Sequence, residues 1–125
     1  MGRDFWIARA QTWQVLAAWR QGDRSIVGFF VSEMPPQPED VAANGLTPHQ
    51  NLSWLLHFYV AVESSVRAGL VDEQFITDLL QPHYQFYEEF FSEFRAEYRI
   101  HMPADRREPS WLTALPRLER VFNEH

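Results

Sequence analysis

The sequence predicts an all-α fold, and three observations carry that prediction. A helix with clear start and stop signals lies between Thr47 and Gly69, and a second helix begins directly after Asp72. Apolar residues recur at helical spacing in most other segments, and no two segments offer strands that could pair. We therefore expect five or six helices in an irregular or orthogonal bundle, with residues 1–125 forming a single domain, since most domains have about 100–150 residues.

A first helix is expected to begin with Asp4 as its N-cap and to reach about Arg20, with Gly22 ending it. At 100° per residue its apolar residues gather on one side. These predicted inward residues are Phe5, Trp6, Trp13, Leu16 and Ala17. Arg9 and Arg20 fall on the middle of the same side, where an arginine either extends along its aliphatic stem to solvent or meets a carboxylate.

Residues 23–34 are the hardest part of the chain to interpret. Residues 26–31 have the composition of a strand but no clean period. A lone strand would leave its backbone groups unsatisfied, so we expect a short buried helix here. The prolines at positions 35, 36 and 38 exclude a helix. A loop with one turn near Glu39 is therefore expected to continue to Leu46.

The next helix has a complete start signal. Thr47 supplies a capping hydroxyl, Pro48 occupies the first helical position, and Gln50 can reach back to the cap amide. Its apolar residues then recur at steps of three and four. They are Leu52, Leu55, Leu56, Tyr59, Val62 and Val66.

The connection to the following helix is very short, so the pair forms an αα-hairpin. Gly69 is expected to take the left-handed conformation that ends a helix. Leu70 and Val71 are expected to fold back on the helix end, and Asp72 is expected to cap the next helix.

An aromatic helix is expected from Pro82 to about Ile100. Its inward residues are Tyr84, Tyr87, Phe91, Phe94 and Tyr98, and Phe86 and Phe90 widen the face. A face this wide usually contacts two neighbours. After a charged loop over 103–109, Ser110 begins a last helical stretch that Pro116 interrupts. Its inward residues are Trp111, Leu112, Leu115, Leu118 and Phe122.

The composition excludes several function classes. The chain has no cysteine and no lysine, so it has no thiolate nucleophile, no Schiff-base lysine and no P-loop lysine. The net charge of −6 argues against a nucleic-acid partner, because phosphate binding needs a basic surface. No apolar run approaches the roughly 18 residues of a membrane span, and no signal pattern is seen, so a cytoplasmic protein is expected. Nineteen aromatic residues exceed what a monomer of this length buries easily, which predicts a pocket or a homodimer contact.

Glu63 is the single carboxylate on the apolar face of the helix that begins at Pro48. Such a group must be paired, protonated or directed into a cavity. One interpretation is an ion pair with an arginine, and the candidates are Arg9, Arg20, Arg67, Arg95 and Arg99. The other is a carboxylate that anchors a ligand or acts as a general base in an aromatic pocket. For that interpretation the predicted ligand-binding residues are Glu63, Arg9, Tyr59 and Arg95.

A second acidic pattern suggests a metal site but lacks the required partners. Glu89, Glu93, Glu97 and His101 follow one another every four residues. Carboxylate-bridged helical bundles need Glu-x-x-His on one helix, and that motif is absent. We expect a solvated acidic face, no metal and no cofactor. No catalytic nucleophile is recognisable either, so an enzyme is the less favoured class.

The turn from Arg67 to Glu73 (Arg-Ala-Gly-Leu-Val-Asp-Glu), with Tyr87, Arg95 and the tail from Trp111 to Leu118, resembles a set of uncharacterised bacterial helical domains of unknown function. The similarity covers about the last 70 residues, and the turn is its specific part. The resemblance implies an all-α fold and supplies no activity.

Three function hypotheses follow. The first is a non-enzymatic interaction or regulatory module that binds a protein partner or itself through an aromatic helix face and an acidic flank. The second is a bundle that binds a small ligand, or acts on it, around Glu63. The third is an acidic decoy of a nucleic-acid-binding protein. The first predicts an exposed apolar patch, the second a closed cavity at Glu63, and the third outward carboxylates spaced like phosphates.

Overall fold

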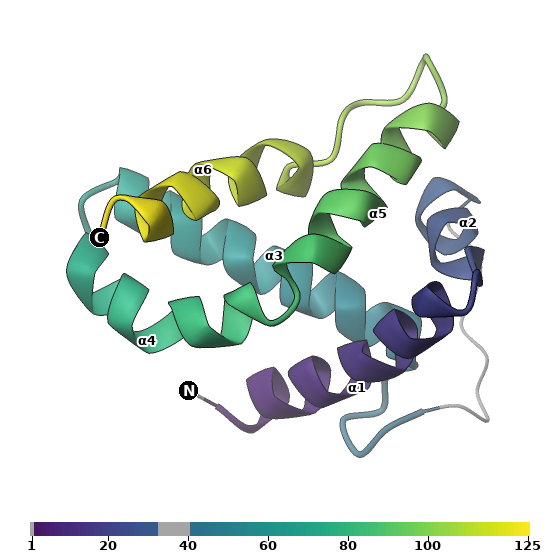
Figure 1. Cartoon of the computed structure of the whole chain (residues 1–125), viewed down its shortest axis with the longest axis horizontal. Helices are drawn as coiled ribbons and strands as arrows, with labels where there is room; N and C mark the ends of the chain where they lie inside the picture. Colours follow the sequence, from purple (N-terminus) through teal and green to yellow (C-terminus); the bar gives the residue numbers. More distant parts are fainter. Residues whose placement is uncertain (1, 33–40) are drawn as a thin grey trace. The chain divides into compact units, whose positions relative to one another are not determined.

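The computed structural model describes residues 2–32 and 41–125, and these contain six helices (Figure 1). The helices are α1 (Arg3–Arg20), α2 (Ser25–Ser32), α3 (Pro48–Arg67), α4 (Glu73–Gln85), α5 (Glu88–His101) and α6 (Trp111–Asn123). No strand occurs in these two ranges, so the all-α prediction and the predicted number of helices are confirmed. The turn predicted near Glu39 lies outside the described residues.

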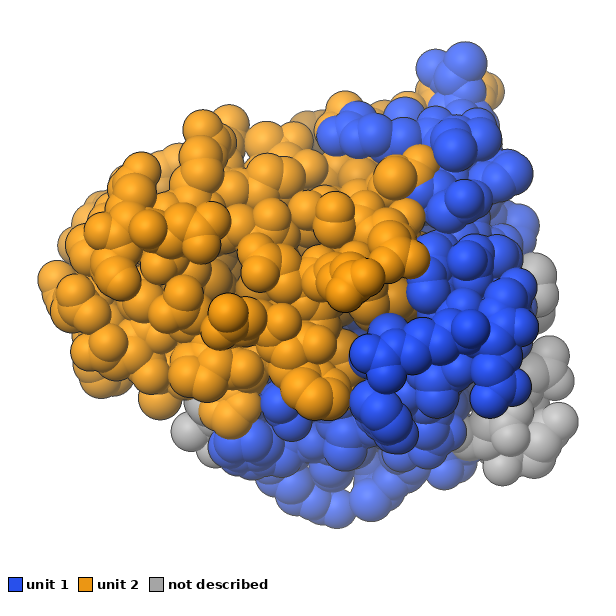
Figure 2. Space-filling model, in the orientation of Figure 1, with its two compact units in different colours: residues 1–56, 97–104 blue, residues 57–96, 105–125 orange. Residues whose placement is uncertain are grey.

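The chain divides into two compact units, which Figure 2 colours separately. Unit 1 comprises residues 1–56 and 97–104, and unit 2 comprises residues 57–96 and 105–125. The large buried side chains of unit 1 are Phe5, Leu16, Trp19, Ile26, Leu52, Leu55, Leu56 and Tyr98. Those of unit 2 are Tyr59, Leu80, Tyr84, Tyr87, Phe90, Phe91, Phe94, Trp111, Leu112, Leu115, Leu118 and Phe122. The prediction of one domain over the whole chain stays a prediction.

Helix α1 is rotated relative to its predicted orientation. It buries Phe5, Ala8, Thr12, Val15, Leu16 and Trp19. Trp6 and Trp13 are 46% and 45% exposed, so placing them inward was wrong. The buried set is itself a continuous stripe, and the two tryptophans lie on a second apolar side of the same helix. Asp4 lies in the first turn and is not the N-cap, which is Gly2.

Helix α2 confirms the short helix predicted within residues 23–34. Ile26 and Val27 are its buried residues. Asp23 precedes the helix, and its carboxylate accepts a hydrogen bond from the amide of Ser25 at 2.8 Å. The strand-like composition of this segment therefore reflects burial of Ile26 and Val27 in a helix, and the part of the chain that the structure describes offers no strand that could pair with it.

Both ends of α3 follow the predicted signals. The Thr47 amide donates to Oε1 of Gln50 at 3.0 Å, and the Gln50 amide donates to Oγ1 of Thr47 at 3.2 Å, which is a capping box. Gly69 has φ of +75°, and the Leu70 amide donates to the Ser65 carbonyl at 2.9 Å, as in a Schellman motif. Leu70 is 77% exposed, so it does not fold back on the helix end as predicted.

The boundary between α4 and α5 lies later than predicted. Asp72 caps α4 through a 3.0 Å hydrogen bond from the Phe75 amide, as expected. Pro82, however, lies inside α4, and α5 begins at Glu88. A proline near the end of a helix removes one backbone hydrogen bond, here the one to the carbonyl of exposed Asp78, where water can replace it. The aromatic stripe predicted to face inward is buried except for Phe86, which is 53% exposed.

Helix α6 continues through Pro116, so the predicted interruption was wrong. Its five predicted inward residues are all buried. They lie on both sides of the proline and share one face. Burying each large apolar side chain contributes roughly 1.5–3 kcal/mol, which together outweighs the roughly 3 kcal/mol cost of the proline.

Candidate functional site

Glu63 is buried on α3, with 6% of its side chain exposed. Its Oε1 lies 3.6 Å from Nε of Arg67, one turn further along α3, and 3.9 Å from Nη1 of Arg117 on α6. The side chains of these two arginines are 62% and 44% exposed. The carboxylate therefore lies inside while the charges that balance it lie at the surface. Arg67 was among the predicted partners of Glu63, and Arg117 was not.

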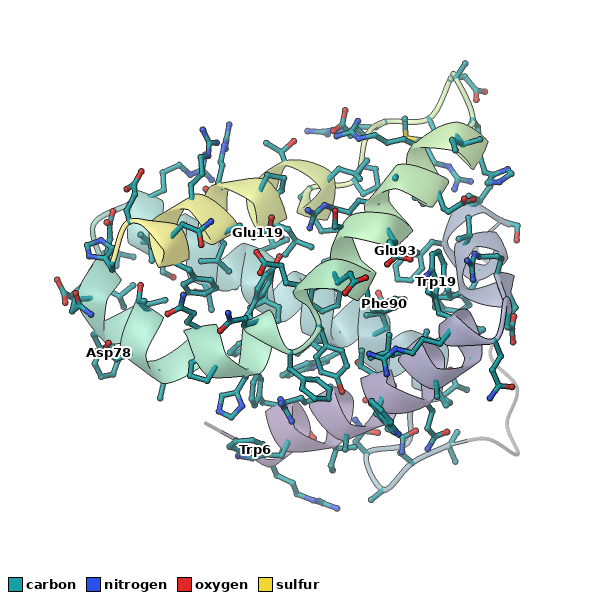
Figure 3. All side chains as sticks on the ribbon, viewed as in Figure 1. Trp6, Trp19, Asp78, Phe90, Glu93 and Glu119 are labelled. Carbon is teal, nitrogen blue, oxygen red and sulfur yellow. The ribbon has the colours of Figure 1, made fainter. Side chains whose placement is uncertain are left out.

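A second polar cluster lies between α4, α5 and α6. Nη1 and Nη2 of Arg95 lie 2.9 and 3.3 Å from the two carboxylate oxygens of Glu119, which Figure 3 labels on α6. The hydroxyl of Tyr84 donates a hydrogen bond to Oε2 of the same carboxylate. The three side chains therefore form one network that joins three helices, and we call it the Glu119 cluster.

The electrostatics of the Glu119 cluster follow from its burial. Burial raises the pKa of the Tyr84 hydroxyl far above its ordinary value, and the neighbouring Glu119 carboxylate raises it further. Burial alone would lower the pKa of Arg95, but hydrogen bonding to Glu119 leaves that pKa raised. Tyr84 thus remains a neutral donor and Arg95 remains a cation, so the cluster holds one positive and one negative charge in contact.

The predicted ligand-binding residues divide between different places in the fold. Tyr59, Glu63 and Arg95 belong to unit 2, whereas Arg9 belongs to α1 in unit 1. The Tyr59 ring lies 5.0 Å from the Tyr84 ring in a T-shaped contact, so it borders the Glu119 cluster. Arg95 pairs with Glu119 rather than with Glu63. The structure thus brings Tyr59 and Arg95 to one cluster and places Glu63 in another.

Sequence reasoning missed Glu119 and Arg117, both on α6. Glu119 directly follows Leu118, so the helical wheel places it at the border of the apolar face. A signal for it was present, because a buried tyrosine hydroxyl and an inward arginine both require an acceptor. The acceptor had to come from another segment, and spacing within one helix does not identify which one.

The acidic ridge on α5 does not form a metal site. Glu89 and Glu93 are exposed, and Nε2 of His101 lies 3.6 Å from Oε2 of Glu97. Within residues 2–32 and 41–125, no group of three histidine or acidic side chains could hold a metal ion. Glu89 and Glu93 thus reach solvent, and the expectation of a site without metal stays a prediction.

The outward side of α4 carries a stripe of apolar residues that reach solvent. Phe75, Leu79 and Phe86 are 60%, 39% and 53% exposed, and exposed Pro82 lies between the last two. Phe86 is the C-cap of α4 and keeps right-handed helical φ and ψ, so it continues the spacing of the helix. These four residues, which we call the α4 stripe, recur at steps of four, three and four. They therefore share an arc of about 60° on the helix. Contiguous exposed apolar residues of this kind are typical of interaction surfaces, whereas isolated ones are ordinary.

Acidic residues border the α4 stripe. Asp72 and Asp78 are exposed and lie about 60° to either side of Phe75 on the helical wheel, and Asp78 is labelled on α4 in Figure 3. Nε2 of Gln74 donates to Oδ1 of Asp78 at 2.8 Å, which holds that carboxylate at the helix surface. The sequence contains no arginine between Arg67 and Arg95, so no nearby basic residue along the chain offsets this negative charge.

Unit 1 contains a small open cavity of about 160 Å³. Its lining residues are Gln14, Val15, Ala18, Asp23, Ser25, Ile26, Pro48 and His49. The backbone hydrogen bond from Ser25 lowers the pKa of Asp23, and nearby His49 adds to that effect. The His49 ring also lies 5.3 Å from the Phe29 ring. Among the lining residues, Asp23 thus already caps a helix and His49 already packs against a ring.

Comparison of this chain with protein-family models, with characterised proteins and with solved structures finds no match. The resemblance suggested by the turn from Arg67 to Glu73 therefore stays a prediction. None of the helices in the described ranges combines the length and the apolar character that crossing a bilayer requires.

Proposed function

We propose that this protein is a non-enzymatic interaction module that binds a protein partner through the α4 stripe. The observation that carries the proposal is the exposure of Phe75, Leu79 and Phe86 along one side of α4 and its C-cap. Leaving large apolar side chains in water is unfavourable by about 25 cal/mol per Å², so covering this stripe with a partner would stabilise both. The acidic border favours a partner whose contact surface is basic.

The α4 stripe replaces the surface originally expected for this role. The aromatic face predicted between Tyr84 and Tyr98 is buried and belongs to the core. The acidic flank remains, since Asp72 and Asp78 are exposed beside the stripe. A reducing compartment such as the cytoplasm suits the module, because the chain has no cysteine to oxidise.

Site-specific photo-cross-linking tests this function. A photoreactive phenylalanine derivative is placed at position 75 or 86, and at exposed Thr113 on α6 as a control. Irradiation in intact cells is expected to give defined protein adducts from positions 75 and 86 and none from position 113. Leu79→Gln in the same chain is expected to reduce the adduct at position 75. Equal labelling at all three positions, or none, would overturn the proposal.

A further inference from the structure

The outward side of α1 repeats the pattern of the α4 stripe. Trp6, Ala10, Trp13 and Ala17 recur at the same steps of four, three and four. Both tryptophans are almost half exposed, Ala10 is exposed and Ala17 is half-buried. We call these four residues the α1 stripe; Trp6 is labelled in Figure 3. Each stripe extends over eleven residue steps, or about 16 Å of helix.

The two stripes differ in the charge that borders them. Helix α1 contains three arginines and one aspartate, a net charge of +2. Arg3 and Arg20 are exposed and flank the α1 stripe, and the guanidinium of Arg20 lies 5.6 Å from the centre of the Trp13 ring. The α4 stripe is bordered by Asp72 and Asp78. One surface is thus apolar with a basic border, and the other is apolar with an acidic border.

We infer that the protein self-associates by packing the α1 stripe of one copy against the α4 stripe of a second copy. This inference rests on the proposed function and names the partner of the α4 stripe. Charge complementarity favours this pairing over contact between two α4 stripes, because the latter would bring acidic borders together.

The shapes of the stripes suit helix-to-helix packing. In the α1 stripe large and small residues alternate, so Ala10 and Ala17 leave depressions between and beside the tryptophan rings. Side chains such as Phe75 and Leu79 can fill depressions of that kind, as ridges fill grooves between packed helices. At 1.5 Å per residue, Arg3 and Arg20 lie about 25 Å apart along α1, whereas Asp72 and Asp78 lie about 9 Å apart at the start of α4. One of the two arginines would therefore lie near these carboxylates, and the direction in which the helices pack decides which one.

The exposed area suits the apolar centre of such a contact. From their exposed fractions, the two tryptophans of the α1 stripe present about 230 Å² of side chain, and the large residues of the α4 stripe present about 300 Å². One α1-to-α4 contact takes one stripe from each copy, and a stable interface usually takes about 800 Å² from each partner, including a polar rim. The stripes therefore form the apolar centre of the interface, and the flanking charged and polar residues supply the rest of the area.

The test measures the mass of the complete chain in solution by sedimentation velocity, from about 1 to 300 μM. The wild-type chain is expected to self-associate, and to do so less strongly at high salt, because the bordering charges are exposed and screened. Trp13→Glu and Phe75→Arg are each expected to weaken association on the order of 30-fold, as loss of a central aromatic contact does. Thr113→Arg and Gln21→Glu, at exposed positions outside both stripes, are the matched controls.

Mixing the Trp13→Glu and Phe75→Arg variants gives the decisive result. The Trp13→Glu chain retains an intact α4 stripe, and the Phe75→Arg chain retains an intact α1 stripe. An equimolar mixture is therefore expected to recover a two-chain species that neither variant forms alone. Trp13→Gln and Phe75→Gln repeat the experiment without new charges if either first variant fails to fold.

Three outcomes overturn the inference. They are a wild-type chain that stays monomeric at 300 μM, association that Phe75→Arg leaves unchanged, and a mixture that stays monomeric. In any of these cases, cellular adducts at position 75 with a different protein would still support the α4 stripe as an interaction surface. Adducts with a second copy of this chain would support both the proposed function and the self-association. The two proposals can therefore be rejected independently of each other.

Discussion

Arg95 on α5 and Glu119 on α6 face each other through two hydrogen bonds, 2.9 and 3.3 Å long, between the guanidinium and both carboxylate oxygens. Their side chains are 12% and 17% exposed, so water screens this pair poorly. The pair connects segments 24 residues apart in the sequence, and Tyr84 adds a third helix to the same carboxylate.

Glu119→Ala is expected to reduce the free energy of unfolding by about 2–4 kcal/mol, because it leaves the Arg95 guanidinium and the Tyr84 hydroxyl without their acceptor. Urea denaturation followed by circular dichroism measures this loss. Glu124→Ala, at an exposed position near the end of the same chain, should change stability by less than about 0.5 kcal/mol. Equal effects of the two substitutions would contradict a structural role for the Glu119 cluster.

Tyr84 should make the fold sensitive to alkali. Its folded-state pKa is raised, so its stabilising contribution is complete below the unfolded-state pKa of 10.0 and declines as the pH rises above that value. Above pH 10.0 the Tyr84 hydroxyl loses its proton in the unfolded chain but keeps it in the folded chain. The free energy of unfolding should therefore fall by up to about 1.4 kcal/mol per pH unit. Urea denaturation between pH 9 and 11.5 measures the slope.

Tyr84→Phe is the control for that slope. It should cost about 1 kcal/mol at pH 7 through the lost hydrogen bond. Above pH 10 the difference from wild type should shrink, because the variant has no hydroxyl to titrate at position 84. If the gap stays constant up to pH 11.5, the raised pKa of Tyr84 is not what limits alkaline stability.

Removing the negative charge of Glu63 should lower stability less than removing the positive charges of Arg67 and Arg117. Glu63→Gln leaves two arginines that already reach water, so we expect a change within about 1 kcal/mol. The double substitution Arg67→Ala, Arg117→Ala leaves a buried carboxylate without a cation and should cost about 2–3 kcal/mol. Adding Glu63→Gln to that double variant should recover most of the loss. A triple variant as unstable as the double one would show that the arginines act through packing alone.

Two glycines should respond to alanine in opposite directions. Gly69 has a positive φ, so Gly69→Ala should destabilise the chain by about 1 kcal/mol through backbone strain. Gly28 lies inside α2, with open space where a Cβ would be placed, and Gly28→Ala should stabilise by about 0.5–1 kcal/mol. Thermal unfolding of the two variants beside the wild type measures both changes. Stabilisation by Gly69→Ala would refute the assignment of the helix end at Gly69, and destabilisation by Gly28→Ala would contradict the open space at position 28.

The sequence by itself determined the local features of this protein. The capping box of Thr47 and Gln50, the helix end at Gly69 and the cap at Asp72 were all predicted from neighbouring residues. These features depend on backbone geometry and on hydrogen bonds within a few residues, so the information for them is contained in short segments. The burial of Glu63 followed from the same kind of local pattern.

Only the tertiary structure decided which side of α1 is buried and which residues pair across helices. Helix α1 has two apolar sides, and burial of the side with Phe5 and Trp19 left Trp6 and Trp13 about half exposed. The partner of Arg95 came from α6, and Pro116 remained helical because apolar residues on both sides of it are buried together. Side-chain burial and ion pairing depend on contacts with segments that are distant in sequence. Periodicity within a single helix therefore could not predict them.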